Sequence, residues 1–281
     1  MKILLAFYMI IVPILASADD CGKVQTMMSE GRVISLFTQE AVRFFRIQTG
    51  FYQKWTGPED ERLKAVCQKA SDAAEVAGEG AVIFIGLDSK LYSLLSESTN
   101  SWVSHTGLLF RTNDSWGVIE SRAPKGSSRL TPLCAFVRRS ADYRFAIAQV
   151  REQLNPGQLK SLKASALEEA EKFYDFSFNL NDSHRSFCSK LTYQAYRAIG
   201  IDLGHPHSLA RLLAQYKGPE SRRRDLSCFW RAWMLNTRLI RGRLRAETDF
   251  QHLTITPGDQ YDLAREGLDD SSIPFFLTFE M

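Results

Sequence analysis

A β-hairpin is predicted by residues 104–120, which read SHTGLLFRTNDSWGVIE. Two mainly apolar runs, at 106–110 and 116–120, are separated by a short polar segment, which is the pattern of two strands joined by a turn. His105 opens the first strand and Glu120 ends the second. The hairpin therefore brings an imidazole and a carboxylate to the same end of a strand pair.

The side chains of His105 and Glu120 are expected to meet on one face of this hairpin. If the turn centres on Thr112 and Asn113, the two residues pair directly across the strands, with Cβ atoms about 5 Å apart. Gly107, two residues after His105 on the same face, has no side chain and leaves space there. A carboxylate beside an imidazole fixes its tautomer and stabilises the imidazolium, as the general base of a cysteine nucleophile requires. The alternative for His105 is a half-exposed strand histidine without a catalytic role.

Short strands and helices alternate along the rest of the chain. Fully apolar runs at 81–85 and 146–150 predict two further strands. Apolar residues at helical spacing predict helices at 34–52, 59–76, 91–96, 155–173 and from Cys188 to Gly200. Strands of this length with flanking helices indicate the α+β class.

Cys188 is the candidate nucleophile. It stands at the predicted start of a helix, after the polar loop 181–186. The free N–H groups and the dipole of a helix N-terminus lower a thiol pKa, and the same groups can hold the oxyanion of an attacked carbonyl. A buried structural thiol, or half of a disulfide, is the alternative. With His105 and Glu120, Cys188 forms a set of nucleophile, base and orienting group.

The ordered set of motifs resembles the permuted papain-fold cysteine amidases, the YiiX/YaeF-like branch of the NlpC-type superfamily. The resemblance runs from about Gly80 to Asp262, and the histidine precedes the cysteine, the reverse of the order in papain. Its pieces are short motifs in family order: the strand at 80–84, Ser-His-Thr-Gly at 104–107, Val-Ile-Glu at 118–120, Tyr-Asp-Phe-Ser-Phe at 174–178, Phe-Cys-Ser at 187–189 and Thr-Pro at 256–257.

The resemblance implies a permuted papain-like (NlpC-type) domain that hydrolyses amide bonds with a thiol. It implies that Cys188 is the nucleophile, His105 the general base and Glu120 the polar third member, with Tyr174 near the site as a substrate-binding residue. Relatives that handle cell-wall peptides, and others that move acyl groups of lipids, leave the substrate open.

Two positions depart from the family pattern. The family's first strand usually begins Gly-Asp, but Ala81 follows Gly80 here, which is expected to loosen a structural contact. The residue two after the nucleophile is usually acidic, but it is Lys190 here, so a different substrate preference is expected.

Residues 1–18 predict a cleaved secretory signal. A positive residue, the apolar run 3–15 and the small-residue site Ala-Ser-Ala place the mature N-terminus at Asp19 and the protein in the periplasm or outside the cell. An uncleaved anchor is the alternative, but the run is shorter than the about 20 residues that span a bilayer. An N-terminal helical segment, 19–77, is expected to precede the hydrolase domain, 78–281.

The chain has five cysteines with scattered spacing, which fits no zinc pattern. Cys21 and Cys67 are a candidate disulfide, although spacing alone does not fix the pairing. His205 and His207 lack a third ligand and are expected to be structural. No metal site and no organic cofactor are expected.

Arginines and aromatic residues interleave in an insertion at about 219–246, between Arg222 and Arg245. The structural interpretation is an amphipathic helix with its aromatic face on the domain and its arginines in solvent. The functional interpretation is peripheral contact with anionic phospholipid or cell-wall polymer. The net charge of +3 is too small to indicate nucleic-acid binding.

The sequence thus predicts an exported cysteine hydrolase that cleaves a peptide or N-acyl amide through a Cys-His-Glu triad and an acyl-enzyme. The substrate is expected to be a peptide or acyl-amide of the cell envelope, derived from cell wall or lipid. One alternative is a lipid acyl hydrolase or transferase with the same triad. The other is a non-catalytic periplasmic binding protein, which a disulfide at Cys188 would favour.

Overall fold

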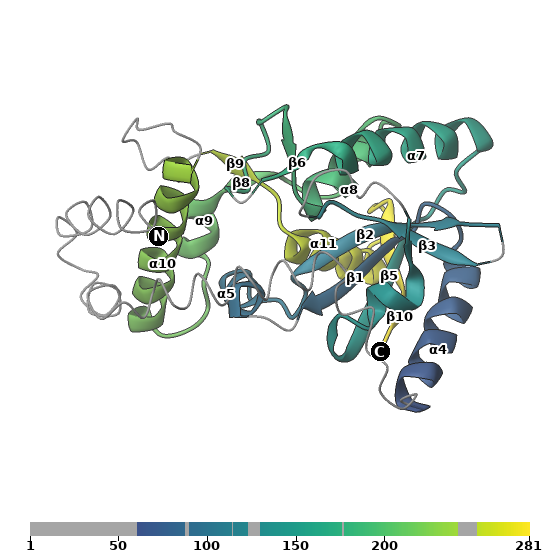
Figure 1. Cartoon of the computed structure of the whole chain (residues 1–281), viewed down its shortest axis with the longest axis horizontal. Helices are drawn as coiled ribbons and strands as arrows, with labels where there is room; N and C mark the ends of the chain where they lie inside the picture. The colour runs from purple at the N-terminus through teal and green to yellow at the C-terminus, as the bar shows by residue number, and fades with distance from the viewer. Residues whose placement is uncertain (1–60, 88–89, 114, 123–129, 176, 241–251) are drawn as a thin grey trace, which may run out of the picture.

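The computed structural model describes residues 61–87, 90–113, 115–122, 130–175, 177–240 and 252–281. Its centre is a six-stranded antiparallel sheet with the strand order β10-β5-β1-β2-β3-β4 (Figure 1). The strands of this sheet are β1 (Val82–Leu87), β2 (His105–Arg111), β3 (Trp116–Ile119), β4 (Thr131–Pro132), β5 (Ser140–Val150) and β10 (Phe275–Glu280).

Helices cover the sheet, and two short strand pairs lie outside it. The helices are α4 (Glu61–Ala77), α5 (Lys90–Ser98), α6 (Leu133–Val137), α7 (Pro156–Glu171), α8 (Cys188–Arg197), α9 (Leu209–Ala214), α10 (Glu220–Ile240) and α11 (Pro257–Asp269). The outlying pairs are parallel β6 (Phe173–Tyr174) with β7 (Arg185–Ser186), and antiparallel β8 (His207–Ser208) with β9 (Leu253–Thr254).

Both faces of the sheet are buried, which explains the fully apolar run of β1. Ile83 and Ile85 belong to a core cluster shared with side chains of α4 and α6, whereas Val82 and Phe84 pack with side chains of α7, α8 and α11. Successive strand side chains point to opposite faces, so a central strand covered on both sides carries apolar residues at every position. The α+β class expected from the sequence is confirmed.

The register of the β2–β3 hairpin differs from the expected one. Leu108 pairs with Ile119 and Phe110 with Gly117, so the turn is centred one residue later than expected. Glu120 therefore does not pair directly with His105. It follows the last residue of β3, and the position directly opposite His105 lies two residues further along the chain. A polar turn of this length admits several alignments, and the hydrophobic pattern alone did not choose between them.

Gly107 allows the Glu120 side chain to reach the histidine diagonally. A Cβ atom at Gly107 would lie 2.4 Å from Cγ1 of Val118 and 3.4 Å from Cβ of Glu120. Any side chain here would push β3 away or displace the carboxylate. Diagonal neighbours in antiparallel strands lie within reach of long side chains. The expectation that His105 and Glu120 share a face holds, although the register that suggested it was wrong.

The helix that carries Cys188 begins where the sequence places it. α8 starts at Cys188, and Gly200, with a φ of 82°, lies just beyond its end. The Ser189 hydroxyl donates to the Ile255 carbonyl at 2.8 Å, and the Gln260 side chain donates to the Ser189 carbonyl at 3.0 Å. These bonds fix the first turn of α8 to the β9–α11 segment.

The proposed Cys21–Cys67 disulfide is wrong, because Cys67 pairs with Cys134. Their Cα atoms lie 4.9 Å apart, in α4 and α6, two helices that pack against each other. Cys228 is also disulfide-bonded, and its partner lies outside the described residues. The pairing follows from packing between segments separated by 67 residues, which cysteine spacing does not encode.

Removing the Cys67–Cys134 disulfide is expected to destabilise the protein without abolishing its fold. Closing a loop of this length in the unfolded chain accounts for roughly 2–5 kcal/mol of stability. The double variant Cys67→Ala/Cys134→Ala should show that loss in urea unfolding under non-reducing conditions. Equal urea midpoints for the variant and the wild type would contradict the expectation.

The helix expected at 59–76 is confirmed as α4, which packs against α6 and β5 in the core. The rest of the expected N-terminal segment and the signal at 1–18 lie outside the described residues. In the part of the chain that the structure covers, no helix combines the length and apolarity needed to cross a bilayer.

The first half of the basic-aromatic insertion packs onto the domain. Trp230 of α10 is fully buried and its indole N–H donates to the Ser98 hydroxyl at 2.9 Å. Arg222 pairs with Glu97 of α5 through contacts of 2.6 and 2.7 Å. Figure 1 shows α9 and α10 at the end of the molecule opposite α4. The described half thus packs an aromatic side chain on the domain, as expected for an amphipathic helix of structural role. Membrane contact through Arg222–Arg245 stays a prediction.

Candidate active site

Cys188 is a buried free thiol at the N-terminus of α8. The N-cap residue is Phe187, whose side chain cannot accept a hydrogen bond, so the cap leaves the first N–H groups of the helix unused. These donors and the helix dipole stabilise negative charge at this end of α8. A thiolate at Cys188, or an oxyanion beside it, would lie at the favourable end of the helix.

His105 connects the thiol to a carboxylate. Its side chain is fully buried, and Nε2 lies 2.6 Å from Oε2 of Glu120. Nδ1 has no nitrogen or oxygen partner among the described residues, and Cys188 is the imidazole's other electrostatic and hydrogen-bonding neighbour. Because Glu120 occupies Nε2, Nδ1 is the ring atom left for the thiol. The imidazole therefore lies between the sulfur and the carboxylate.

The net effect of these neighbours is a raised pKa at His105. Burial alone lowers the pKa of the imidazole, but the negative charges of Cys188 and Glu120, together with the hydrogen bonds to both, outweigh burial. The protonated imidazole is thus stabilised in a site that would otherwise exclude charge. This is the electrostatic condition for a thiolate–imidazolium pair.

Three groups hold the carboxylate of Glu120, which is itself almost fully buried. Besides His105, the Thr131 hydroxyl donates to Oε1 at 2.7 Å, and Nη2 of Arg139 lies 2.8 Å from each carboxylate oxygen. Burial acts to raise the pKa of Glu120, but the Arg139 guanidinium and the bond to His105 bring it far below its usual range. Glu120 is therefore ionised throughout the physiological pH range.

Aromatic side chains fix the plane of the imidazole. Phe136 of α6 stacks on His105 with ring centroids 5.6 Å apart and planes inclined by 27°. Tyr92 of α5 meets the imidazole edge-on at 6.2 Å. The Arg139 guanidinium lies over the same Phe136 ring, 4.9 Å from its centroid. Packing on two sides limits rotation of the ring, so the hydrogen bond to Glu120 persists.

Tyr174 lies close to these residues, as its expected position near the site requires. It is buried in β6, and its electrostatic neighbours include Tyr92 and Cys188. Burial first, and then the neighbouring Tyr92, raises the pKa of the Tyr174 hydroxyl well above its usual value. The hydroxyl is therefore a neutral group beside the thiol, and a contact with substrate stays a prediction.

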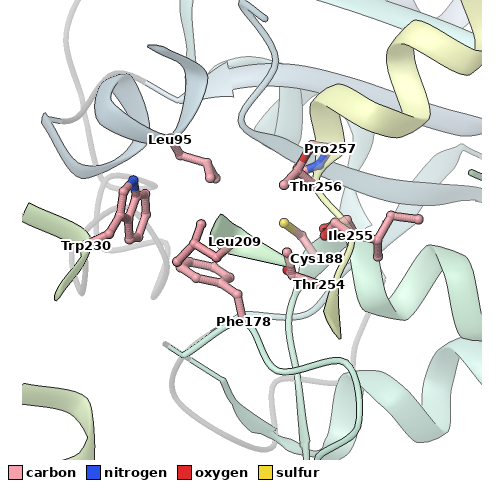
Figure 2. Close-up of a pocket in the computed structure, with 10 residues that line it drawn as sticks. Leu95, Phe178, Cys188, Leu209, Trp230, Thr254, Ile255, Thr256 and Pro257 are labelled. Carbon is pink, nitrogen blue, oxygen red and sulfur yellow. The ribbon is translucent and has the colours of Figure 1, made fainter. Parts of the chain in front are cut away.

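An apolar pocket opens beside the sulfur. Figure 2 shows the Cys188 side chain directed into a space ringed by the residues that line it. These come from six parts of the chain: Leu95, Phe178, Cys188, Ser189, Leu209, Trp230, Thr254, Ile255, Thr256 and Pro257. No charged side chain is among them. The free volume inside is about 10 Å³, enough for about one water-sized group.

Lys190 does not point toward this pocket. Its buried ammonium donates to the carbonyls of Asp182 and Arg185, the latter at 2.9 Å, and burial lowers its pKa. Lys190 thus ties α8 to the loop that precedes β7. The lysine at this position, where the family usually has an acidic residue, therefore affects how α8 is held and not what lines the pocket.

Of the remaining histidine candidates, His207 has a structural partner. Nε2 of His207 lies 2.9 Å from the Asp259 carboxylate, which also caps α11 through Thr256. Within the described ranges, no group of three or more His, Cys, Asp or Glu side chains is arranged to hold a metal ion. His205 and His207 therefore do not form part of such a group there.

Sequence reasoning missed Arg139, Thr131 and Phe136. All three contact the histidine–glutamate pair, but each comes from the β4–α6–β5 region, outside the motifs that identified the pair. No sequence signal marked Arg139, which lies seven residues before the strand predicted at 146–150 and next to β5 only as observed. Only the fold shows that this side chain is 9% exposed and paired with a buried carboxylate.

The antiparallel sheet, the helix that begins at a buried cysteine, and the histidine on a neighbouring strand define a cysteine hydrolase of papain-like type. The chain belongs to the family of permuted papain-like amidases, YaeF/YiiX, C92 family, whose model matches residues 76–231. The fold and the enzyme class expected from the sequence are thereby confirmed.

One similar solved structure is described as the metalloprotein yiiX from Escherichia coli O157:H7. The identity is 21% and the TM-score 0.53, over 72% of this chain and 97% of that chain. At this identity the likeness supports the fold alone. A comparison with curated proteins gave no match.

Proposed function

We propose that this protein is an exported amidase in which Cys188, His105 and Glu120 form the catalytic triad. The observation that carries the proposal is the buried imidazole held between a free thiol at a helix N-terminus and an ionised carboxylate. A nucleophile, its base and an orienting group in hydrogen-bonding order are what thiol catalysis of acyl transfer requires.

The proposed reaction has two chemical stages. His105 takes the proton of Cys188, and the thiolate attacks the carbonyl carbon of an amide, with the oxyanion held by the N–H of Cys188. The imidazolium then gives its proton to the leaving amine, leaving a thioester on the sulfur. In the second stage His105 takes a proton from water, hydroxide adds to the thioester, and the carboxylic acid is released with the thiol restored.

Export is supported by the oxidised cysteines. Cys67 is bonded to Cys134, Cys228 is also disulfide-bonded, and such bonds persist in oxidising compartments. The signal at 1–18 is the sequence feature that would direct the chain there. We therefore propose that the protein acts in the periplasm or outside the cell, on peptide or N-acyl amides of the envelope.

The apolar pocket bears on the alternative candidate, a lipid acyl hydrolase or transferase with the same triad. Its lining has no charged side chain, which suits an acyl group, but its free volume of about 10 Å³ is far smaller than a long lipid acyl chain. A disulfide at Cys188 would have favoured a non-catalytic binding protein, but Cys188 is a free thiol.

The proposal is tested by trapping the acyl-enzyme. The mature protein and its Cys188→Ser variant are incubated with a panel of N-acyl amides, esters and cell-wall peptides, quenched in acid and analysed by intact mass. An acyl mass on the wild type that maps to Cys188 and is absent from the variant supports the thiol mechanism. Release of product at equal rates by both proteins would overturn it.

A further inference from the structure

We infer that the apolar pocket at Cys188 is the subsite for the acyl part of the substrate, and that it accepts a short, uncharged acyl group. The inference rests on the proposed thiol chemistry, because the acyl group is the part of the substrate that remains bonded to the sulfur. Cys188 forms part of the pocket wall. The group that becomes the thioester therefore enters the space in front of this sulfur.

The position of the imidazole separates the acyl side from the leaving-group side. His105 must protonate the leaving amine, so the leaving group lies on the imidazole side of the sulfur. The residues around the imidazole, His105, Glu120, Tyr92 and Phe136, do not line the pocket. The pocket thus opens on the other side of Cys188, which is the side of the acyl group.

The pocket lining determines what fits. Leu95, Leu209 and Trp230 are buried, and the free volume of about 10 Å³ leaves room for about one methyl-sized group, such as the methyl of an acetyl group. Two of the three hydroxyls in the lining are engaged: Ser189 donates to Ile255 and Thr256 to Asp259.

The third hydroxyl, that of Thr254, is buried without a partner among the described residues. The pocket surface is thus almost wholly apolar, and it has no charge that would receive a carboxylate or an ammonium.

The test uses p-nitrophenyl acetate, butyrate, octanoate and monosuccinate as acylating probes. The rate constant for acylation of Cys188 is read from the p-nitrophenolate burst and confirmed by intact mass. Acetate is expected to react about 10-fold or more faster than octanoate, and the charged succinate slowest. Leu209→Ala should raise the octanoate-to-acetate ratio about 10-fold, and Leu209→Val should raise it less.

Leu213→Ala is the matched control, because Leu213 is equally buried on α9 but does not line the pocket. An unchanged ratio in both Leu209 variants, or succinate reacting as fast as acetate, overturns the subsite. If no ester acylates Cys188 in the wild type, the thiol mechanism itself fails. The two failures are therefore distinguishable.

A separate observation concerns Arg139. We propose that Arg139 is a positioning residue that keeps Glu120 ionised and directed at His105, and thereby supports the imidazolium that faces the Cys188 thiolate. Burial acts to protonate the Glu120 carboxyl, and the Arg139 guanidinium, 2.8 Å from both carboxylate oxygens, opposes that effect. Without Arg139 the carboxyl would gain a proton or lose its orientation toward Nε2, and the His105 imidazolium would lose its counter-charge.

Arg139 also shapes the site mechanically. Nη2 contacts both oxygens of Glu120 at 2.8 Å, and the guanidinium and the His105 imidazole both lie against the Phe136 ring. The charged and titratable groups that face this set from the packed elements are Cys188 of α8, Tyr92 of α5, Tyr174 of β6 and Arg122 after β3. Arg122 is the other cation that acts on Glu120.

Alkylation of Cys188 by iodoacetamide as a function of pH tests this role. Arg139→Met should move the midpoint of thiolate formation to higher pH by about one unit or more, and Arg139→Lys, which keeps the charge, should restore most of that shift. Arg144→Met is the matched control, because Arg144 also pairs with a carboxylate, Glu280, and lies over an aromatic ring, but on the surface.

A merely structural role would leave the midpoint unchanged in all folded variants. An unshifted midpoint in a folded Arg139→Met protein therefore overturns the proposal, as would an equal shift in Arg144→Met. Absence of any thiolate at low pH in the wild type would instead contradict the triad.

Discussion

His105→Ala is expected to lower the rate of amide cleavage by about 10²–10⁴-fold, with far less effect on folding. The imidazole is the only base that the described residues place against both the Cys188 thiol and a carboxylate. Without it the thiol has no base to take its proton, and the leaving amine has no proton donor. The measurement is kcat/KM on an amide identified by acyl-enzyme trapping.

His207→Ala provides the control for this loss. His207 is also largely buried, and its Nε2 lies 2.9 Å from a carboxylate, that of Asp259. It does not contact the thiol, so this variant should keep wild-type turnover. If both variants lost activity equally, the loss would reflect general disturbance of the fold and the role of His105 would be contradicted.

Glu120→Gln is expected to have the largest effect on stability, about 3–5 kcal/mol at neutral pH. The substitution keeps the shape of the side chain but removes the charge that Arg139 faces in a buried site. Breaking one partner of a buried ion pair leaves the other charge uncompensated. The free energy of unfolding in urea is the measurement, and activity should fall as well because His105 loses its orienting partner.

The pH dependence of this effect follows from the lowered pKa of Glu120. A group whose folded pKa lies below its unfolded value stabilises the protein fully above the unfolded pKa, roughly 4.3 for glutamate, and loses this contribution as the pH falls further. The stability difference between wild type and Glu120→Gln should therefore narrow below about pH 4, and it should also fall as the pH rises through the raised pKa of His105, because Glu120 stabilises the imidazolium. A difference that widens toward acid would contradict the assignment.

Glu280→Gln serves as the comparison for a surface pair. Glu280 bonds to Arg144 at 2.6 Å, but both side chains are substantially exposed. Exposed pairs contribute about 0–1 kcal/mol, so this variant should be nearly neutral. Equal losses in the two variants would show that burial of the Glu120–Arg139 pair does not matter.

Much of the fold was predictable because burial on both faces leaves a clear pattern in the sequence. The run at 81–85 predicted β1, and Asn155 followed by Pro156 predicted the start of α7, where Asn155 forms a capping box with Gln158. The start of α8 at Cys188 was predicted from a polar loop followed by helical spacing. These are local signals, and local signals are read well from one sequence.

What the sequence did not predict depends on contacts between distant segments. The strand β10 and the short helix α6 carry weak periodicity, and their places are set by packing against β5 and α4. The Cys67–Cys134 bond and the Arg139–Glu120 pair both follow from that packing. The predicted hairpin register was wrong for a related reason. The turn sequence is compatible with more than one alignment of the two strands, and the close packing of β3 against Gly107 selects the observed one.

The central claim is that Cys188 forms a thiolate stabilised by His105, and the pH profile of its alkylation tests this most directly. The mature protein and His105→Ala are labelled with iodoacetamide between pH 4 and pH 10, and the site is confirmed by mass mapping. The account predicts that Cys188 is alkylated at a lower pH in the wild type than in the variant, because His105 supplies the counter-charge of the thiolate. A Cys188 that is inert, or that reacts with the same profile in both proteins, would contradict the thiolate–imidazolium pair and with it the proposed amidase mechanism.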